Sequence, residues 1–201
     1  MDRLLEGYRR FRAGRWPRMA DLYAELAEGQ SPRTLVIACS DSRVDPAAIF
    51  DAAPGELFVI RNVANLVPPF EEGGGYHGTS AAIEFAVQAL QVEEIVVLGH
   101  ARCGGCAAAL APGSVAQGSF LAKWISLLEP AKARIAHVRE GLAPALEHES
   151  IKVALENLQT FPFVAAAVAA GALHLRGARF DIVSGRLEIF DPAINDFALL
   201  P

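Results

Sequence analysis

The stretch LVIACSDSR, residues 35–43, runs from a purely apolar segment straight into a thiol, a carboxylate and a guanidinium. The apolar segment is typical of a strand that is buried on both faces. It ends in Cys39, and Asp41 and Arg43 follow at once. In open α/β sheets, binding sites form outside the carboxyl ends of the parallel strands. The stretch therefore predicts a central strand with a functional site at its end.

Other apolar runs predict the rest of a parallel sheet. The expected buried strands are residues 34–38, 57–60 and 94–99. Residues 79–92, between the second and third of these strands, show the single apolar face of a helix. Strand, helix and strand in this order imply a right-handed parallel crossover. A Ser-Gly turn at 184–185 lies between two strand-like runs and predicts a closing antiparallel hairpin.

Helical spacing of apolar residues marks both ends of the chain. Two short helices are expected near 4–11 and 19–26, within an arm over residues 1–30 that could lie on a partner subunit. Further helices are expected over 116–128, 131–141, 146–159 and 162–175. A length of 201 residues without internal repeats favours a single domain over 1–201. The predicted fold class is α/β, with a mostly parallel central β-sheet, an antiparallel edge hairpin, flanking helices and an N-terminal helical arm.

The composition argues against several classes of protein. Hydrophobic residues make up 52% and charged residues 20%, as in folded globular proteins. The net charge is −5 and basic clusters such as RRFR at 9–12 are short, so we expect no nucleic acid partner. The N-terminal stretch lacks the apolar core of a signal peptide, and FPFVAAAVAAGALHL is too short and alanine-rich to span a bilayer. We expect a cytoplasmic protein with no membrane partner.

Cys39, His100 and Cys103 are the candidate metal ligands. His100 and Cys103 come directly after the third expected strand, so they can meet Cys39 at one edge of the sheet. Two thiolates and an imidazole suit zinc, and three protein ligands leave a fourth position open, as in catalytic zinc sites. A redox pair formed by Cys103 and Cys106 is the competing interpretation. Cys106 alone is more simply a small core residue.

Asp41 has two available roles beside such a metal. It could bind zinc directly and close the site. It could instead pair with Arg43, whose planar fork matches a carboxylate, and accept a hydrogen bond from zinc-bound water. The second role leaves zinc free to lower the pKa of that water towards about 7 and so to provide hydroxide. A salt bridge at the strand end without a catalytic duty is the remaining alternative.

These residues and their order resemble the β-class carbonic anhydrases. The resemblance covers nearly the whole chain and rests on ACSDSRVDP (38–46), PGELFVIRNVANLVPP (54–69), AAIEFAVQAL (81–90) and IVVLGHARCGG (95–105), and more loosely on 156–164 and 180–190. It implies one zinc per chain bound by Cys39, His100 and Cys103, with Asp41 and Arg43 as the catalytic dyad. The implied reaction is the reversible hydration of carbon dioxide to bicarbonate and a proton by zinc-bound hydroxide. The family's minimal unit is a dimer, often assembled further, for example into tetramers, with active sites at the dimer interface.

The resemblance also implies the open, plant-type kind of active site. The other kind has a bicarbonate-binding inhibitory pocket that needs a tryptophan, an arginine and a tyrosine, where this chain has Val36, Arg61 and Phe85. Gln30 falls where the open kind has a substrate-holding glutamine, although on its own it is only a polar loop residue. The substrate-binding residues implied are Gln30, Phe58, Val63, Phe85 and Gly104. Phe85 stands where a tyrosine is common, so the pocket wall loses a hydroxyl.

Two other functions remain open from the sequence. A hydrolase of carbonyl sulfide or carbon disulfide would use the same fold and the same zinc chemistry. A non-enzymatic zinc module would have Asp41 as its fourth ligand.

Overall fold

The computed structural model describes residues 1–73 and 75–200, in two compact units. The first unit, Met1–Ser31, is helical almost throughout: α1 (Asp2–Arg10), a π-helical turn (Phe11–Arg15) and α2 (Trp16–Ala27) follow one another. The two expected helices are present as α1 and α2, and a π-helical turn joins them without a break. Pro17 lies in the first turn of α2 and lacks the N–H that would continue the hydrogen-bond ladder, so the wider turn carries the helix past it.

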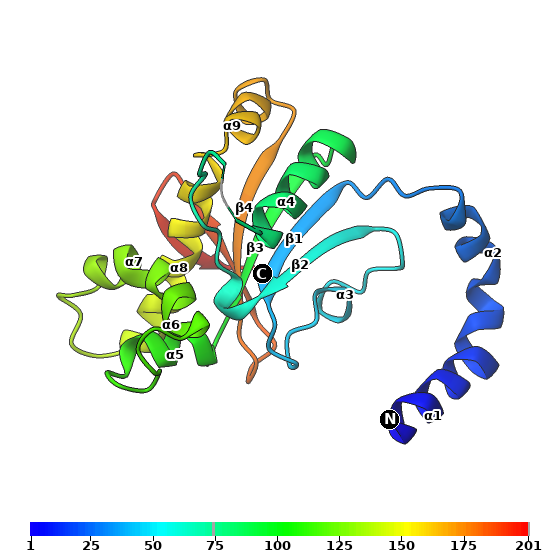
Figure 1. Cartoon of the computed structure of the whole chain (residues 1–201), viewed down its shortest axis with the longest axis horizontal. Coiled ribbons are helices and arrows are strands. Elements are labelled where there is room, and N and C mark those ends of the chain that lie inside the picture. The colour runs from blue at the N-terminus through cyan, green and yellow to red at the C-terminus, as the bar shows by residue number, and fades with distance from the viewer. Residues whose placement is uncertain (74, 201) are drawn as a thin grey trace. The chain divides into compact units, whose positions relative to one another are not determined.

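The second unit begins at Pro32 and is built on a sheet of six strands within the described residues, in the order β2-β1-β3-β4-β5-β6 (Figure 1). The strands are β1 (Thr34–Cys39), β2 (Leu57–Asn62), β3 (Glu94–His100), β4 (His174–Phe180), β5 (Leu187–Asp191) and β6 (Asp196–Leu199). Strands β1 to β4 pair in parallel, whereas β5 and β6 are antiparallel. The predicted fold class is confirmed, and β6 adds an edge strand that the sequence reading lacked. The single domain over 1–201 stays a prediction.

Strand β1 has the environment that its apolar sequence predicts. It lies between β2 and β3, and Leu35 to Ala38 are fully buried. The register sets Ala38 opposite Leu98 of β3 and Cys39 opposite Asn62 of β2. Strands β1 and β3 therefore end at the same edge of the sheet, where the first one delivers Cys39 and the second His100.

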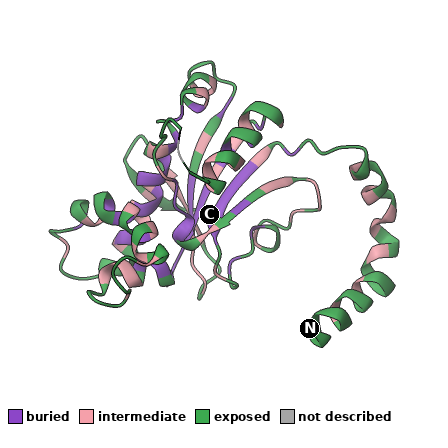
Figure 2. Cartoon of the chain, in the orientation of Figure 1, coloured by how far each residue is buried: buried purple, intermediate pink, exposed green. Residues whose placement is uncertain are grey.

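Helices cover the sheet unevenly. They are α3 (Pro46–Ile49), a 3-10 turn (Val63–Asn65), α4 (Gly78–Glu84) with a π-helical turn (Phe85–Ala89), α5 (Gly104–Leu110), α6 (Phe120–Ile125) with a 3-10 turn (Ser126–Leu128), α7 (Glu129–Arg134), α8 (Leu142–Leu158) and α9 (Pro162–Ala169). The main core forms where α4, α8 and α9 pack on one face of the sheet. Figure 2 shows buried residues gathered in the central strands and α8. Among the described residues, no helix combines the length and apolar character needed to cross a membrane.

Helix α9 is shorter than the sequence suggests. A helix over 162–175 was expected, but α9 ends at Ala169 and β4 begins at His174. Gly171 has a φ of 70°, and the N–H of Ala172 donates to the carbonyl of Ala167. A residue in the left-handed region just beyond a helix is a common stop signal, and glycine is the usual choice. The alanine-rich run hid this signal because alanine is a strong helix former, so the helical pattern of the sequence continues past Gly171.

Gly99 provides a test of how tightly β3 packs on α8. A Cβ at this position would lie 2.6 Å from Cδ1 of the fully buried Ile151. Gly99→Ala should therefore lower the free energy of unfolding by about 1–3 kcal/mol through overpacking, measured by urea denaturation. Gly78→Ala is the control, because a Cβ there meets nothing within 4 Å. Equal stability of the two variants would contradict this packing.

Candidate metal centre

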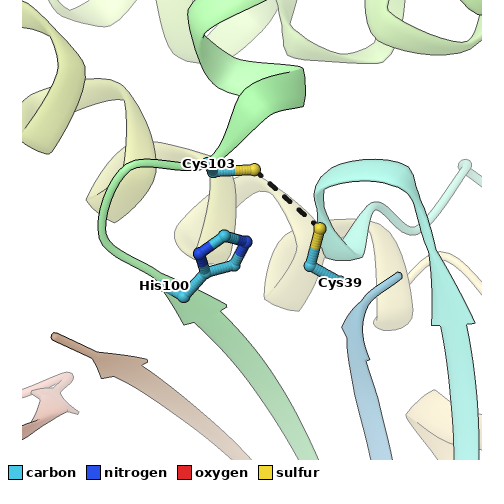
Figure 3. Close-up of side chains that lie close together, drawn as sticks. All are labelled: Cys39, His100 and Cys103. Atoms are coloured by element: carbon cyan, nitrogen blue, oxygen red, sulfur yellow. Dashed lines mark hydrogen bonds between the residues drawn. The ribbon is translucent and has the colours of Figure 1, made fainter. Parts of the chain in front are cut away.

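The three predicted ligands lie together at the carboxyl edge of the sheet. Cys39 ends β1, His100 ends β3 and Cys103 directly precedes α5, and all three are buried. One possible ligand atom from each residue lies within 4.8 Å of the others, and the two sulfur atoms are 4.0 Å apart (Figure 3). Two thiolates on a tetrahedral zinc, each about 2.3 Å from the metal, would be about 3.8 Å apart. The spacing therefore fits zinc without rearrangement of the backbone.

The imidazole of His100 has the orientation of a metal ligand. Its Nδ1 lies 2.9 Å from the carbonyl oxygen of Ala101, an arrangement in which Nδ1–H donates and the other nitrogen carries the lone pair. That other nitrogen, Nε2, is buried without a hydrogen-bond partner in the described part of the chain. In Figure 3 one ring nitrogen faces the two sulfur atoms. A buried lone pair without a donor is what a bound cation satisfies.

The two thiols need a cation to become charged. Hydrogen bonding with Cys103, together with burial, raises the pKa of Cys39 to about 12. Hydrogen bonding with Cys106, together with burial, raises the pKa of Cys103 to about 12. The start of α5 would favour the Cys103 thiolate, but the hydrogen bond with Cys106 and burial outweigh that effect. A metal that binds both sulfurs supplies the missing positive charge.

Cys106 does not belong to this group of ligand atoms. It is buried in the apolar cluster that also contains Ile125 and Leu128. That position agrees with the interpretation as a small core residue. All three cysteines are free thiols in this structure.

Asp41 and Arg43 form the expected pair. Arg43 Nε donates to Asp41 Oδ1 over 2.9 Å and Arg43 Nη2 donates to Oδ2 over 2.7 Å. The backbone N–H of Arg43 donates to Oδ1 as well. Hydrogen bonding from Arg43 holds the pKa of the Asp41 carboxyl well below its usual range, so the carboxylate stays ionised near neutral pH. The structure thus has the paired arrangement, and the catalytic role of the pair stays a prediction.

Arg61 supports the loop that carries this pair. Its Nε donates to the carbonyl of Cys39 over 3.0 Å, its Nη2 to the carbonyl of Asp41 over 2.6 Å, and its Nη1 to Asp45 over 3.2 Å. One guanidinium therefore fixes the chain from the metal ligand to the end of the loop. Sequence reasoning missed this role. The parallel register could have suggested it, because Arg61 lies opposite Ala38 on the neighbouring strand.

The short turn after β2 also contacts the centre. The backbone N–H of Ala64 lies 3.4 Å from the sulfur of Cys39, within reach of an N–H···S hydrogen bond. Ala64 has a left-handed φ of 64°, which is costly for a residue other than glycine. Trp124 holds the turn by donating its indole N–H to the carbonyl of Val63 over 2.8 Å. Gly105 permits the close approach of α5, because a Cβ there would lie 2.8 Å from the Cβ of Ala64.

Two predicted substrate-binding residues lie at the centre. Val63 directly precedes Ala64 and is 37% exposed. Gly104 follows Cys103 and has open space where a Cβ would be. Both could therefore border a small molecule near the ligand atoms.

The other predicted pocket residues are not brought to the centre within one chain. Phe58 and Phe85 contact each other, with ring centroids 5.8 Å apart. Phe58 is in register with Leu35, four residues before Cys39, which places it about 13 Å away along the strand. Gln30 belongs to the first unit, so its assignment stays a prediction.

Comparisons with known proteins agree on one family. A family model described as carbonic anhydrase matches residues 34–187. The chain is 35% identical to beta carbonic anhydrase 3 of Arabidopsis thaliana, over 95% of this chain and 77% of that protein. The structure of the β-carbonic anhydrase CcaA is 36% identical with a TM-score of 0.94, over 100% of this chain and 92% of that chain. A structure from work on two tetrameric β-carbonic anhydrases of Sordaria macrospora is 31% identical with a TM-score of 0.83, over 94% of this chain and 95% of that chain.

The ligand assignment predicts which cysteines govern metal content. Cys39→Ser and Cys103→Ser should each lose most of the zinc, because each removes a thiolate from the three-ligand set. Cys106→Ala is the matched control, since it removes a neighbouring buried thiol that is outside the set. Zinc per chain is measured by atomic emission on the purified, folded proteins. Loss of zinc from the Cys106 variant alone would show that the wrong thiols have been assigned.

Proposed function

Because the chain belongs to the β-class carbonic anhydrases, a family of zinc-dependent lyases, we propose that it catalyses the reversible hydration of carbon dioxide to bicarbonate and a proton. The observation that supports this most directly is the position of the Asp41–Arg43 pair. The pair begins two residues after the ligand Cys39, and its carboxylate is kept off the ligand group by two donors of one guanidinium. A non-enzymatic site closed by Asp41 would not need that arrangement.

The residues of the metal centre would have different roles in the reaction. Cys39, His100 and Cys103 would hold zinc, which when bound supplies the Lewis acidity that makes hydroxide available near neutral pH. The ionised carboxylate of Asp41 would accept a hydrogen bond from the attacking nucleophile and orient it towards the substrate. Arg43 would keep that carboxylate in place. Val63 would provide an apolar wall, which suits carbon dioxide because this molecule has no dipole.

Self-association would complete the pocket. Phe58 lies on β2, an edge strand of the sheet, and its ring contacts Phe85 of the π-helical turn after α4. Val59 and Phe85 are exposed. The relatives from Sordaria macrospora are described as tetrameric. We propose that this chain also forms a dimer or a larger assembly, in which a second copy brings these aromatic residues to the metal centre. The cytoplasmic location expected from the sequence stays a prediction.

The substrate is tested by two assays on the same zinc-loaded protein. One follows proton release from dissolved carbon dioxide in a stopped-flow instrument, and the other follows sulfide release from carbonyl sulfide and carbon disulfide. We expect rapid hydration of carbon dioxide and much slower release of sulfide. The reverse ranking would assign the chain to the hydrolases that use the same chemistry.

Arg43→Ala tests the role of the dyad. Without the guanidinium, the carboxylate of Asp41 is free to bind the metal as a fourth ligand, so zinc should remain while turnover falls by orders of magnitude. Asp41→Ala is the contrasting variant. It cannot close the site and loses only the orienting acceptor, so some turnover should remain.

Zinc content, the hydration rate and a crystal structure of the Arg43→Ala protein check this pair of variants. An Arg43→Ala protein that hydrates carbon dioxide at the parent rate, with Asp41 still away from zinc, would reduce the dyad to a salt bridge at a strand end.

A further inference from the structure

We propose that Glu147 is a positioning residue for the metal ligand Cys103, and that Arg179 holds the Glu147 carboxylate in place. The inference rests on the proposed metal centre and concerns residues that lie behind it. Glu147 of α8 is 2% exposed and Arg179 of β4 is 7% exposed. The reaction proposed above uses neither group.

The two oxygens of Glu147 serve different donors. Oε1 accepts the backbone N–H of Cys103 over 3.2 Å. Oε2 accepts Nε and Nη2 of Arg179 over 3.0 and 2.7 Å. The carboxylate therefore links the backbone of a metal ligand to a guanidinium fixed in the sheet.

The segment that Glu147 holds is a strained turn between two ligands. It leaves β3 at His100 and reaches Cys103 through Arg102, whose φ is 58°. The N–H of Ala101 is anchored by the carbonyl of Phe180 over 2.9 Å. Glu147 supplies the second anchor at the other end of the turn. A backbone in a sparsely populated conformation persists only when its surroundings fix it in this way.

The same turn also supports the catalytic pair. The carbonyl of Arg102 accepts a hydrogen bond from Nη2 of Arg43 over 3.3 Å, and that nitrogen also donates to Asp41. A shift at Cys103 would therefore move an acceptor that helps to place Arg43. Glu147 thus influences the position of the metal ligand Cys103 and, through Arg43, that of the dyad, without contacting the substrate.

Stability alone does not explain a charged pair at this depth. Apolar residues of similar volume often stabilise a core as well as a buried ion pair does. The ion pair of Glu147 and Arg179 is also part of a longer chain of polar contacts. Nη1 of Arg179 donates to Glu188 over 2.7 Å, and Glu188 lies 3.0 Å from Nε2 of His148. These contacts fix the guanidinium from its far side, so the position of Glu147 is determined by the sheet.

The chemistry of the carboxylate gives a sharp test. A carboxylate offers two acceptor oxygens, here one for the N–H of Cys103 and one for the guanidinium of Arg179, whereas the amide of Gln offers only one. In Glu147→Gln the charged Arg179 should take that oxygen and leave the N–H of Cys103 facing the amide nitrogen. Losing such a partner usually weakens metal affinity by about 10- to 100-fold, so zinc should pass to a chromogenic chelator faster than from the parent by about that factor.

A double variant distinguishes positioning from a general loss of structure. Arg179→Met in the Glu147→Gln background removes the competing donor, so the amide oxygen can again accept from Cys103. Zinc release should return to within about three-fold of the parent rate, with recovery of the hydration rate. Failure of this rescue, with both proteins folded, would overturn the proposal.

Leu158→Ala controls for a loss of stability. Leu158 lies on the same helix, fully buried in the main core cluster, which does not include the ligand cysteines. This variant should unfold more easily but release zinc at the parent rate below its melting temperature. Faster release from it, equal to that of Glu147→Gln, would overturn the proposal. A parent protein without zinc would instead refute the metal centre itself.

Discussion

The parallel pairing of β1 with β3 is the constraint on which the site depends. The register sets Ala38 opposite Leu98, so the chain leaves both strands at one edge and delivers Cys39 and His100 to the same place. Both strands pack into apolar clusters on each of their faces, and a slip of one residue would exchange the side chains that fill the two clusters. Burial of the strands therefore fixes the spacing of the ligands before any metal binds.

A second set of residues, without chemistry of their own, holds the reactive groups. Arg61 fixes the loop after Cys39, Trp124 fixes the turn whose N–H faces the Cys39 sulfur, and Glu147 fixes the backbone of Cys103. These residues come from a strand and two helices, which the core already locks together. The centre is therefore held from several directions, as precise ligand geometry requires.

The central strands and the three ligands were predictable from the sequence, because apolar runs and ligand chemistry are local properties. The end of α9 was missed although Gly171 marked it, since the high helix propensity of alanine extended the helical pattern past that residue. The role of Arg61 could be suggested only once the register of β1 and β2 was known, and that of Glu147 was not predictable. Their hydrogen-bond partners lie 22 and 44 residues away, and only the folded chain brings each pair together. Phe58 and Phe85 were placed in the pocket by resemblance, and one chain does not bring them there.

The hydrogen bonds of Arg61 have a consequence for control of the enzyme. Its guanidinium already donates to the carbonyls of Cys39 and Asp41 and to the Asp45 carboxylate, so these donors are not available to clamp an anion. Val36 is fully buried, and Phe85 carries no hydroxyl. In the described part of the chain, these three positions therefore lack the free donors that the inhibitory pocket would need. If the chain hydrates carbon dioxide as proposed, we expect accumulated bicarbonate not to slow the reaction by binding at these positions.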